Sequence, residues 1–224
     1  MNTAAQPRTP TTAMLLVLGG IAMISGLLVV LAAQLTAPLI AENQRQAIER
    51  ALVKVIPGSV IYRRYRVEGE KLVPAAEGDP GIIYAGYDAD GRLLGIAAKG
   101  AAQGYADMIY LLYGYDPACQ CIRGIQVLKL AETPGLGDRI MKDPAFLKNF
   151  EALDAQLDAT GTALLHPIVT VKHGSRKDPW EIDAISGATI SSRAVGQAIN
   201  RSAQRILPAI RPLLDRISRL EETP

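Results

Sequence analysis

GIIYAGYDADGRLLGIAAKG, residues 81–100, is the stretch from which the fold follows most directly. Two runs of apolar and aromatic residues flank the segment DADG, residues 88–91, in which Asp90 precedes Gly91. An Asp-Gly pair favours a tight turn between strands, because glycine adopts the positive φ angle that such turns require. The stretch therefore predicts a β-hairpin.

A second hairpin follows along the chain. It joins MIYLLYGY, residues 108–115, to IRGIQVLKL, residues 122–130, through the turn DPACQC, residues 116–121. The two hairpins predict an antiparallel sheet of at least four strands, with β-branched and aromatic side chains on its buried face. Residues 59–80 predict a strand-and-loop lead-in, and LLHPIVTVKHG, residues 164–174, predicts a further strand.

Helical patterns surround these strands. Residues 137–157 have helical spacing on both sides of Pro144, and a longer pattern begins at Ser191 and Ser192, which are candidate N-caps. The fold class that follows is α+β, an antiparallel sheet flanked by helices.

The C-terminal part of the longer pattern contains Pro208 and Pro212, which are expected to kink or divide the helix. An apolar stripe flanked by arginines lies beyond them. It fits packing on the domain itself and docking on a membrane or a partner protein equally well. Its members are Ile210, Leu213, Leu214, Ile217 and Leu220.

An apolar segment precedes the sheet. AMLLVLGGIAMISGLLVVLAAQL, residues 13–35, contains no charged side chain. As a helix at about 1.5 Å per residue it extends roughly 34 Å, enough to cross a hydrocarbon core of roughly 30 Å. A cleaved signal peptide is the alternative, because Arg8 precedes the segment and small residues follow it, but signal cores usually have about 7 to 15 residues. A retained transmembrane anchor is therefore favoured.

The chain beyond this anchor is expected to continue as a helix from Pro38 to Pro57-Gly58 and then to form one sizeable domain. The expected division is a tail at residues 1–12, the anchor at 13–36, a connecting helix at 37–58, the main domain at 59–207 and a helical extension at 208–224.

Charge is distributed unevenly along the chain. The 24 Lys and Arg nearly balance the 22 Asp and Glu, and Arg8 is the single charged side chain before Glu42. A net charge of +2 excludes a dedicated nucleic-acid binder, so no nucleic-acid partner is expected. The charges on the two sides of the apolar segment do not fix its orientation in a membrane.

Familiar catalytic motifs are missing from the sequence. His166 and His173 form no HExxH pattern, and no P-loop, GxGxxG, GxSxG or paired CxxC motif occurs. Cys119 and Cys121 are interpreted as two loop thiols, because a single intervening residue makes an unstrained mutual disulfide difficult. The pair supplies at most half of a four-ligand metal site, so no metal is expected.

The segment DAISGATIS, residues 183–191, stands immediately ahead of the last predicted helix. Gly187 and Ala188 leave room for another molecule to approach the backbone, and Thr189 presents a hydroxyl where free helix N–H groups point. Such an arrangement attracts a phosphate. On these grounds alone the segment is either an anion site or a simple helix cap.

The same segment resembles the flavinylation motif of the covalent FMN-binding domain family, Asp-x-x-[Ser/Thr]-Gly-Ala-Thr-x-[Ser/Thr]. In that family a flavin transferase moves FMN from FAD onto the threonine hydroxyl through a phosphoester bond. The positions that match are Asp183, Ser186, Gly187, Ala188, Thr189 and Ser191.

A second segment, ETPGLG at residues 132–137, is similar to the loop that lies along the isoalloxazine ring in the same family, and Gly104-Tyr105 is similar to its Gly-Tyr loop. The resemblance makes Thr189 the covalent attachment residue. It also implies cofactor contacts from Asp183, Ser186, Gly187, Ala188, Ile190, Ser191, Glu132, Thr133, Gly135, Leu136, Gly137 and Tyr105.

The apolar anchor, the first hairpin, Gly-Tyr, the second hairpin, ETPGLG and SGAT follow one another along the chain. This order is similar to that in the G subunits of Rnf-type ferredoxin:NAD oxidoreductase complexes and, more distantly, to that in the C subunits of sodium-translocating NADH:quinone oxidoreductases. The resemblance implies an electron-carrying subunit of a redox-driven ion pump, not catalytic alone, with a covalent FMN and no catalytic acid or base. It implies the other subunits and a flavin transferase as partners, and an inner-membrane location with the FMN domain on the periplasmic side. A membrane-anchored binding domain without redox function is the remaining alternative.

The sequence departs from the family pattern at one place. Many relatives have a histidine shortly before ETPGLG, where this chain has Lys129, Leu130 and Ala131. This chain therefore has no histidine at this place that could transfer a proton.

Overall fold

The computed structural model describes residues 11–69, 71–76, 79 and 81–218. Two compact units make up the chain, Met1–Gln46 and Ala47–Pro224. Helix α1, Thr11–Val55, begins in the first unit and ends in the second.

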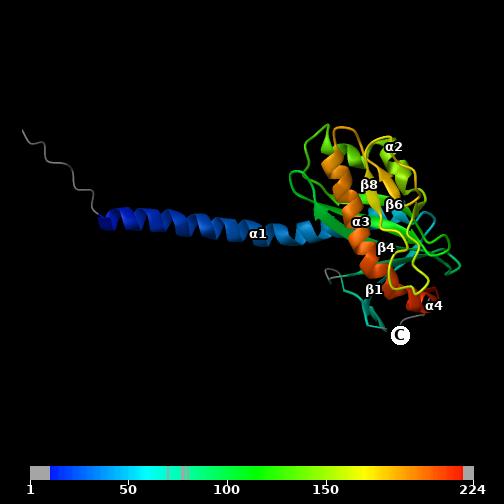
Figure 1. The fold of residues 1–224 in the computed structure, drawn as a ribbon. Coiled ribbons are helices and arrows are strands. Elements are labelled where there is room, and N and C mark those ends of the chain that lie inside the picture. Colours follow the sequence, from blue (N-terminus) through cyan, green and yellow to red (C-terminus); the bar gives the residue numbers. More distant parts are fainter. Residues whose placement is uncertain (1–10, 70, 77–78, 80, 219–224) are drawn as a thin grey trace, which may run out of the picture. The chain divides into compact units, whose positions relative to one another are not determined.

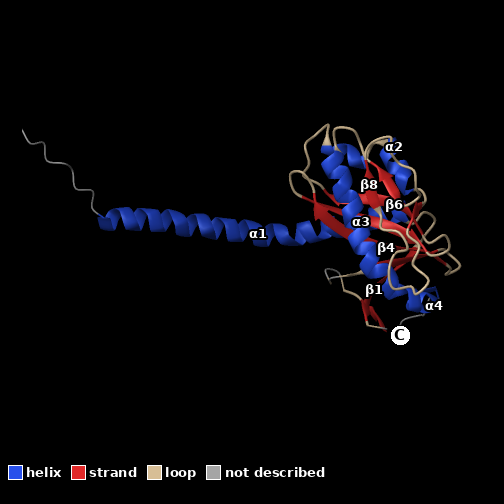
Figure 2. Cartoon of the chain, viewed as in Figure 1, coloured by secondary structure: helices blue, strands red, loops and turns tan. Residues whose placement is uncertain are grey.

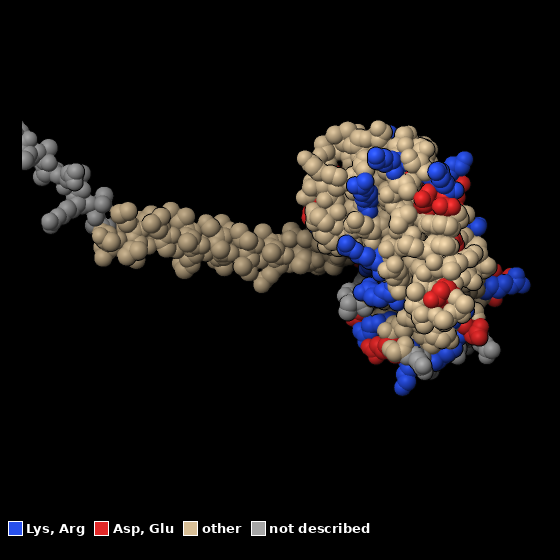
Figure 3. All heavy atoms as spheres, in the orientation of Figure 1, with Lys and Arg blue, Asp and Glu red and all other residues tan. Residues whose placement is uncertain are grey.

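The described part of the first unit is helical and apolar. From Met14 to Leu31 the large apolar side chains are between 45% and 76% exposed, and the helix is long and apolar enough to cross a membrane. Its visible face carries no charged side chain in Figure 3. The helix continues through Pro38, because one missing backbone donor does not end a long helix whose other hydrogen bonds remain. The division between the anchor and the connecting helix stays a prediction.

The second unit is built on an antiparallel sheet (Figure 2). Within the described residues the sheet has seven strands in the order β2-β1-β3-β4-β5-β6-β7. The strands are β1 Ile61–Glu68, β2 Lys71–Pro74, β3 Ile83–Tyr87, β4 Leu93–Gln103, β5 Met108–Asp116, β6 Cys121–Lys129 and β7 Leu153–Asp154. Both predicted hairpins are confirmed as β3–β4 and β5–β6. The α+β fold class is confirmed as well.

A separate pair of short parallel strands, β8 Val169–Val171 and β9 Glu181–Asp183, leads into the SGAT segment, residues 186–189. The strand predicted in residues 164–174 is β8, which is shorter than the apolar pattern. Strand β9 ends at Asp183, and the short loop that follows leads directly into helix α3, Thr189–Ile210.

Helices cover both faces of the large sheet. Helix α3 lies across β4 and β5 on one face, as Figure 1 shows, and the last turns of α1 pack on the other. Successive strand residues alternate between the two cores, so Ala98 and Leu111 face the α3 side while Ala97 and Leu112 face Ala51, Leu52 and Val55.

The position of α3 on the sheet is fixed by backbone proximity and by a buried polar link. A Cβ atom added at Gly100 of β4 would lie 2.8 Å from the Ala198 carbonyl oxygen, so the two backbones are in close contact. The Tyr113 hydroxyl donates to Ser202 Oγ over 3.1 Å, and Ser202 Oγ donates to the Lys99 carbonyl over 2.7 Å. Burial raises the pKa of Tyr113, which keeps its hydroxyl protonated as the donor.

Residues 137–157, which have helical spacing on both sides of Pro144, form short helices. They are η1 Gly137–Met141, α2 Pro144–Leu147 and η2 Lys148–Phe150. Asp143 starts a new helix, because its side chain accepts hydrogen bonds from the amides of Ala145 and Phe146, and the chain then enters β7. The helical spacing of the sequence is therefore real, but the cap at Asp143 separates it into two short helices, η1 before it and α2 after it.

The C-terminal apolar stripe packs on its own domain. Helix α3 continues through Pro208, and η3 Arg211–Leu213 and α4 Leu214–Ser218 follow. Ile210, Leu213 and Ile217 are at most 3% exposed, and the Tyr87 hydroxyl donates to the Ile217 carbonyl over 2.7 Å. The stripe belongs to the core; its last member, Leu220, lies outside the described residues.

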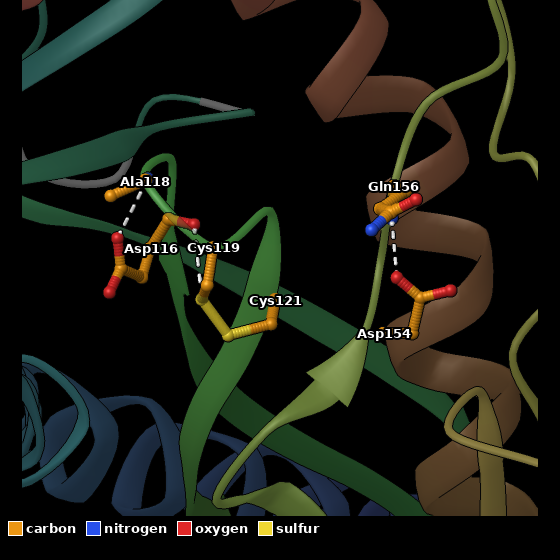
Figure 4. The surroundings of a disulfide bond; sticks show 6 residues. All are labelled: Asp116, Ala118, Cys119, Cys121, Asp154 and Gln156. Carbon is orange, nitrogen blue, oxygen red and sulfur yellow. Dashed lines mark hydrogen bonds between the residues drawn. A yellow bond between two sulfur atoms is a disulfide. The ribbon is translucent and has the colours of Figure 1, made fainter.

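The turn between β5 and β6 corrects the interpretation of two loop thiols, because Cys119 and Cys121 form a disulfide (Figure 4). Their Cα atoms are 5.2 Å apart, within the range that a disulfide spans. Gln120 between them has a φ angle of +52°, in the left-handed region. This backbone conformation, which the sequence does not reveal, turns the two side chains toward each other.

Candidate functional site

Three segments that are far apart in the sequence meet at one cavity of about 520 Å³. They are the Gly-Tyr loop between β4 and β5, the ETPGLG loop after β6, and the SGAT segment with the first turn of α3. The lining residues are Tyr105, Glu132, Thr133, Leu136, Gly137, Gly187, Ala188, Thr189, Ile190 and Ser191. A cavity of this size is in the range that holds cofactor-sized ligands.

The first turn of α3 points unused hydrogen-bond donors at this cavity. Ala188 is the N-cap residue and supplies no side-chain hydrogen bond, so the first N–H groups of the helix keep no capping partner from it. Among the residues that the structure describes, none forms a hydrogen bond with the Thr189 hydroxyl. Gly187 precedes the cap with a φ angle of +82°, a conformation that glycine adopts without strain.

Ser191 and Ser192 are not N-caps, contrary to the prediction, because the helix begins before them. Ser192 Oγ instead accepts from the Ile185 amide over 3.1 Å and donates to the Ala188 carbonyl over 2.9 Å. Ser192 is fully buried and therefore holds the SGAT segment from inside the domain. These two hydrogen bonds fix the shape of the turn, and the N–H groups at the start of α3 keep no side-chain cap.

Glu132 connects all three segments of the site. One of its carboxylate oxygens accepts from the Ser191 hydroxyl over 2.5 Å, and the other accepts from the Ala106 amide over 3.1 Å. The side chain is 8% exposed. Glu132 therefore holds the Gly-Tyr loop and the start of α3 against the ETPGLG loop, a role that its identification as a cofactor contact did not include.

Two glycines make room for this carboxylate. A Cβ atom added at Gly137 would lie 2.6 Å from Glu132 Oε2 and 2.8 Å from Ser191 Oγ. At Gly104 it would meet Glu132 Oε1 and would lie 2.9 Å from the Asp107 carbonyl oxygen. Both positions therefore require glycine for the three segments to approach one another.

Arg139 is a site residue that sequence reasoning missed. Its guanidinium donates to the Ser186 carbonyl over 3.1 Å and to the Asp143 carboxylate over 2.8 Å. The first of these hydrogen bonds ties η1 to the SGAT segment and places a positive charge beside it. No motif marks an arginine that acts on a backbone carbonyl 47 positions further along the chain.

Three of the expected contacts lie outside the cavity lining. Asp183 accepts from the Gly174 amide over 2.7 Å and so fixes the loop between β8 and β9. Ser186 is exposed and engages Arg139 through its carbonyl oxygen. Gly135 supplies a turn with a φ angle of +79°.

Comparisons with known proteins identify the family of the chain. Residues 104–204 match the model of the FMN-binding domain, a span that includes all three segments of the site. The G subunit of an ion-translocating oxidoreductase complex from Pseudomonas aeruginosa is 33% identical over 84% of this chain and 84% of its own length. The chain therefore belongs to the family formed by the G subunits of ion-translocating oxidoreductase complexes.

Two further relatives are aligned over less of their length. The G subunits from Methanosarcina acetivorans and Acetobacterium woodii are each 34% identical, over 58% and 54% of this chain. The chain spans 61% of the first and 53% of the second, less than two thirds of either. The A. woodii protein is named as part of a Na⁺-translocating ferredoxin:NAD⁺ oxidoreductase complex.

Solved structures support the fold. NqrC of Shewanella oneidensis covers 79% of this chain and 98% of its own with a TM-score of 0.61 at 20% identity. The C subunit of a Na⁺-translocating NADH-quinone reductase from Parabacteroides distasonis covers 75% and 92% with a TM-score of 0.59 at 18% identity. Together with the apolar helix α1, the family relationship describes a membrane-anchored FMN-binding subunit.

The residues present fit FMN. The uncapped terminus of α3 and the Thr189 hydroxyl suit its phosphate, and Gly187 leaves space beside them. Tyr105, Leu136 and Ile190 are at least 50% exposed around the same cavity and offer apolar surface to a flat ring system.

Proposed function

We propose that this chain is the electron-carrying G subunit of an Rnf-type ion-translocating complex, which couples ferredoxin and NAD. In this proposal FMN is attached to Thr189 Oγ1 through a phosphoester bond. The observation that carries the proposal is the position of Thr189, whose hydroxyl lies at the uncapped start of α3 in the cavity formed by the three segments.

Attachment requires a hydroxyl that is free to react beside donors that hold a phosphate. Thr189 is half-buried on the cavity wall, and the first N–H groups of α3 are available to phosphate oxygens. A flavin transferase would move FMN from FAD to Thr189, and AMP would leave. The Arg139 guanidinium, held by the Ser186 carbonyl and Asp143, adds positive potential near the phosphate.

The remaining residues of the cavity position the cofactor. FMN supplies the acceptance and release of electrons when bound. Glu132 holds the Gly-Tyr and ETPGLG loops against the start of α3 through its two hydrogen bonds. Leu136 and Ile190 provide apolar surface for the ring. Electrons would arrive from and leave to the other proteins of the complex, so the chain would not be catalytic alone.

The apolar helix and the disulfide support a proposal for the location of the protein. We place α1 in the inner membrane as a single span and the FMN-binding domain on the periplasmic side. A disulfide persists in an oxidising compartment and is rare in the cytosol, so the Cys119–Cys121 bond favours this orientation. Protease added to right-side-out spheroplasts should cleave the domain, whereas protection of the domain would reverse the proposed orientation.

The quinone-reducing complex, represented by the two solved structures, is the nearest alternative. Those structures share the fold at 18–20% identity, whereas the relatives from ion-translocating oxidoreductase complexes reach 33–34%. This difference in identity favours the Rnf-type assignment. The identity of co-purifying proteins distinguishes the two, because one complex contains ferredoxin-type clusters and the other a quinone site.

The attachment is tested with Thr189→Val, a variant of nearly equal volume that lacks the hydroxyl. We expect the variant to fold but to carry no covalent flavin, so its band in a denaturing gel is not fluorescent and its intact mass lacks the FMN increment. Thr189→Ser keeps a hydroxyl and should retain some flavin.

Thr162→Val is the matched control, because Thr162 is exposed and lies outside the cavity lining. This variant should keep full fluorescence. Covalent flavin on Thr189→Val would contradict the attachment site, and an unmodified wild-type chain from a host that contains the transferase would favour a non-redox binding domain.

A further inference from the structure

A second depression, of about 420 Å³, borders the disulfide. Both Cys119 and Cys121 line it, opposite the segment that carries Asp154 and Gln156 (Figure 4). The stacked rings of His166 and Trp180, with centroids 3.8 Å apart, form another wall.

This depression is separate from the FMN cavity. The disulfide follows the C-terminal end of β5, whereas the Gly-Tyr loop precedes its N-terminal end. At about 3.4 Å per residue the nine residues of β5 separate these ends by roughly 27 Å. The function of the FMN cavity therefore does not account for the disulfide.

A stabilising role explains the disulfide poorly. The stability that a cross-link provides grows with the length of the loop that it closes, and here the two cysteines are two positions apart. By the loop-entropy relation such a link contributes less than a cross-link between distant segments. The β5–β6 pairing already holds this turn, because Asp116 pairs with Cys121.

The backbone inside the link is unfavourable for its residue type. Among the residues that the structure describes, Gln120 is the only one other than glycine with a positive φ angle, +52°. A side chain in this region has a conformational cost, and such costs concentrate at functional sites.

The two sulfur-bearing residues differ in accessibility. Cys119 is exposed, whereas Cys121 is 6% exposed at the start of β6. An incoming thiolate can therefore reach Cys119 Sγ more easily, and Cys121 is the natural leaving group. Exposed disulfides are also the ones that exchange most readily.

We propose that the Cys119–Cys121 disulfide is a thiol–disulfide exchange site, at which a dithiol protein of the same compartment reduces the bond by attack on Cys119 Sγ. The first thiolate of the dithiol forms a mixed disulfide with Cys119, and Cys121 leaves as a thiolate. The second thiol of the dithiol protein, as a thiolate, then attacks that protein's own sulfur in the mixed disulfide. Cys119 leaves as a thiolate. Two electrons pass to the cysteine pair, which takes up two protons, and the dithiol becomes a disulfide.

Native reduction is the first test. The full-length, flavin-loaded chain in detergent is treated with millimolar dithiothreitol, trapped with N-ethylmaleimide and weighed intact. We expect two maleimide additions per chain, with flavin absorbance and far-UV circular dichroism unchanged, and reversal by glutathione disulfide. Additions that appear only after denaturation would identify a closed structural link and overturn the proposal, as would thiols that glutathione disulfide fails to join.

Direction of attack is tested with two single-cysteine variants. Cys121→Ser leaves the exposed Cys119 thiol, and Cys119→Ser leaves the buried Cys121 thiol. We expect glutathione disulfide to modify Cys119 roughly tenfold faster or more, because access controls the rate. Equal rates, or a faster Cys121, would overturn attack at Cys119, and far-UV circular dichroism of both variants verifies that the domain is folded.

Discussion

The Ser191 hydroxyl donates to Glu132 Oε2, which joins the first turn of α3 to the ETPGLG loop across 59 positions of sequence. Glu132 also accepts from the Ala106 amide, so one buried carboxylate receives donors from the other two segments of the site. Hydrogen bonds to a charged group are stronger than those between neutral groups, and an unpaired buried partner is costly. The geometry of the flavin cavity therefore depends on this contact.

Glu132→Gln and Ser191→Ala are expected to lower the free energy of unfolding by about 1–3 kcal/mol each, because each leaves a buried polar group without its partner. The double variant should cost less than the sum of the two, with a coupling of about 0.5–3 kcal/mol. Denaturant unfolding of the four full-length chains in detergent measures this cycle. Strictly additive costs would show that the hydrogen bond contributes nothing.

Gly137→Ala should destabilise the domain by about 1–3 kcal/mol and reduce the fraction of chains with flavin, because the new Cβ would overlap Glu132 and Ser191. Denaturant unfolding and the ratio of flavin to protein absorbance measure the two effects. Gly124→Ala is the control, since its Cβ would have its nearest neighbours at 3.6 Å. We expect the control to stay within about 0.5 kcal/mol of wild type.

Arg139→Gln should slow covalent flavin attachment several-fold with a stability loss of about 1 kcal/mol or less, because the Arg139 side chain is 39% exposed. Its loss frees the Ser186 carbonyl and removes positive charge beside the SGAT segment. The rate of flavin incorporation from FAD and purified transferase measures the effect. Arg201→Gln removes an exposed charge further along α3 and should incorporate flavin at the wild-type rate.

Acid should destabilise the domain below about pH 4. The Phe146 amide, followed by Arg139, lowers the pKa of Asp143, and the amides of Lys177 and Asp178 lower the pKa of Glu181. A carboxyl group with a lowered folded-state pKa stabilises the fold above its unfolded-state pKa of about 4, and this stability is lost as pH falls through the folded-state pKa. Melting temperatures should therefore vary little between about pH 7 and 5 and fall below about 4.

Asp143→Asn should make this decline shallower, because asparagine can still cap α2 but does not titrate. Asp90→Asn, at an exposed turn, should reproduce the wild-type dependence of melting temperature on pH. An unchanged slope in Asp143→Asn would show that this carboxylate does not contribute to acid sensitivity.

Local patterns predicted the two hairpins correctly, because an Asp-Gly turn and alternating apolar residues report directly on neighbouring strands. Helix ends were less predictable. Ser191 and Ser192 have the composition of N-caps, but tertiary packing starts α3 at Thr189 and draws Ser192 inward to the Ile185 amide. The disulfide was missed for a related reason, since it depends on the left-handed backbone of Gln120.

For the candidate site, the three sequence segments contain every residue that lines the cavity, since each motif is a contiguous segment. Arg139 was missed because it acts on the backbone carbonyl of Ser186, where any side chain would serve as well. The position of Asp183 away from the cavity likewise depends on its contact with the Gly174 amide. Side chains that work through distant backbone atoms leave no pattern in a single sequence.

The close contact between Gly100 and the backbone at Ala198 would affect the precision with which a cofactor attached at Thr189, as proposed, is held. Side chains change rotamer readily, but two backbones in direct contact cannot move closer together. The distance between α3 and the sheet is therefore fixed at this point. A group bonded to the first residue of α3 would share the rigidity of the sheet, so small changes elsewhere in the core would hardly alter its distance to an external electron donor. Gly100, although it does not line the cavity, would thereby fix the position of the attached cofactor relative to the sheet.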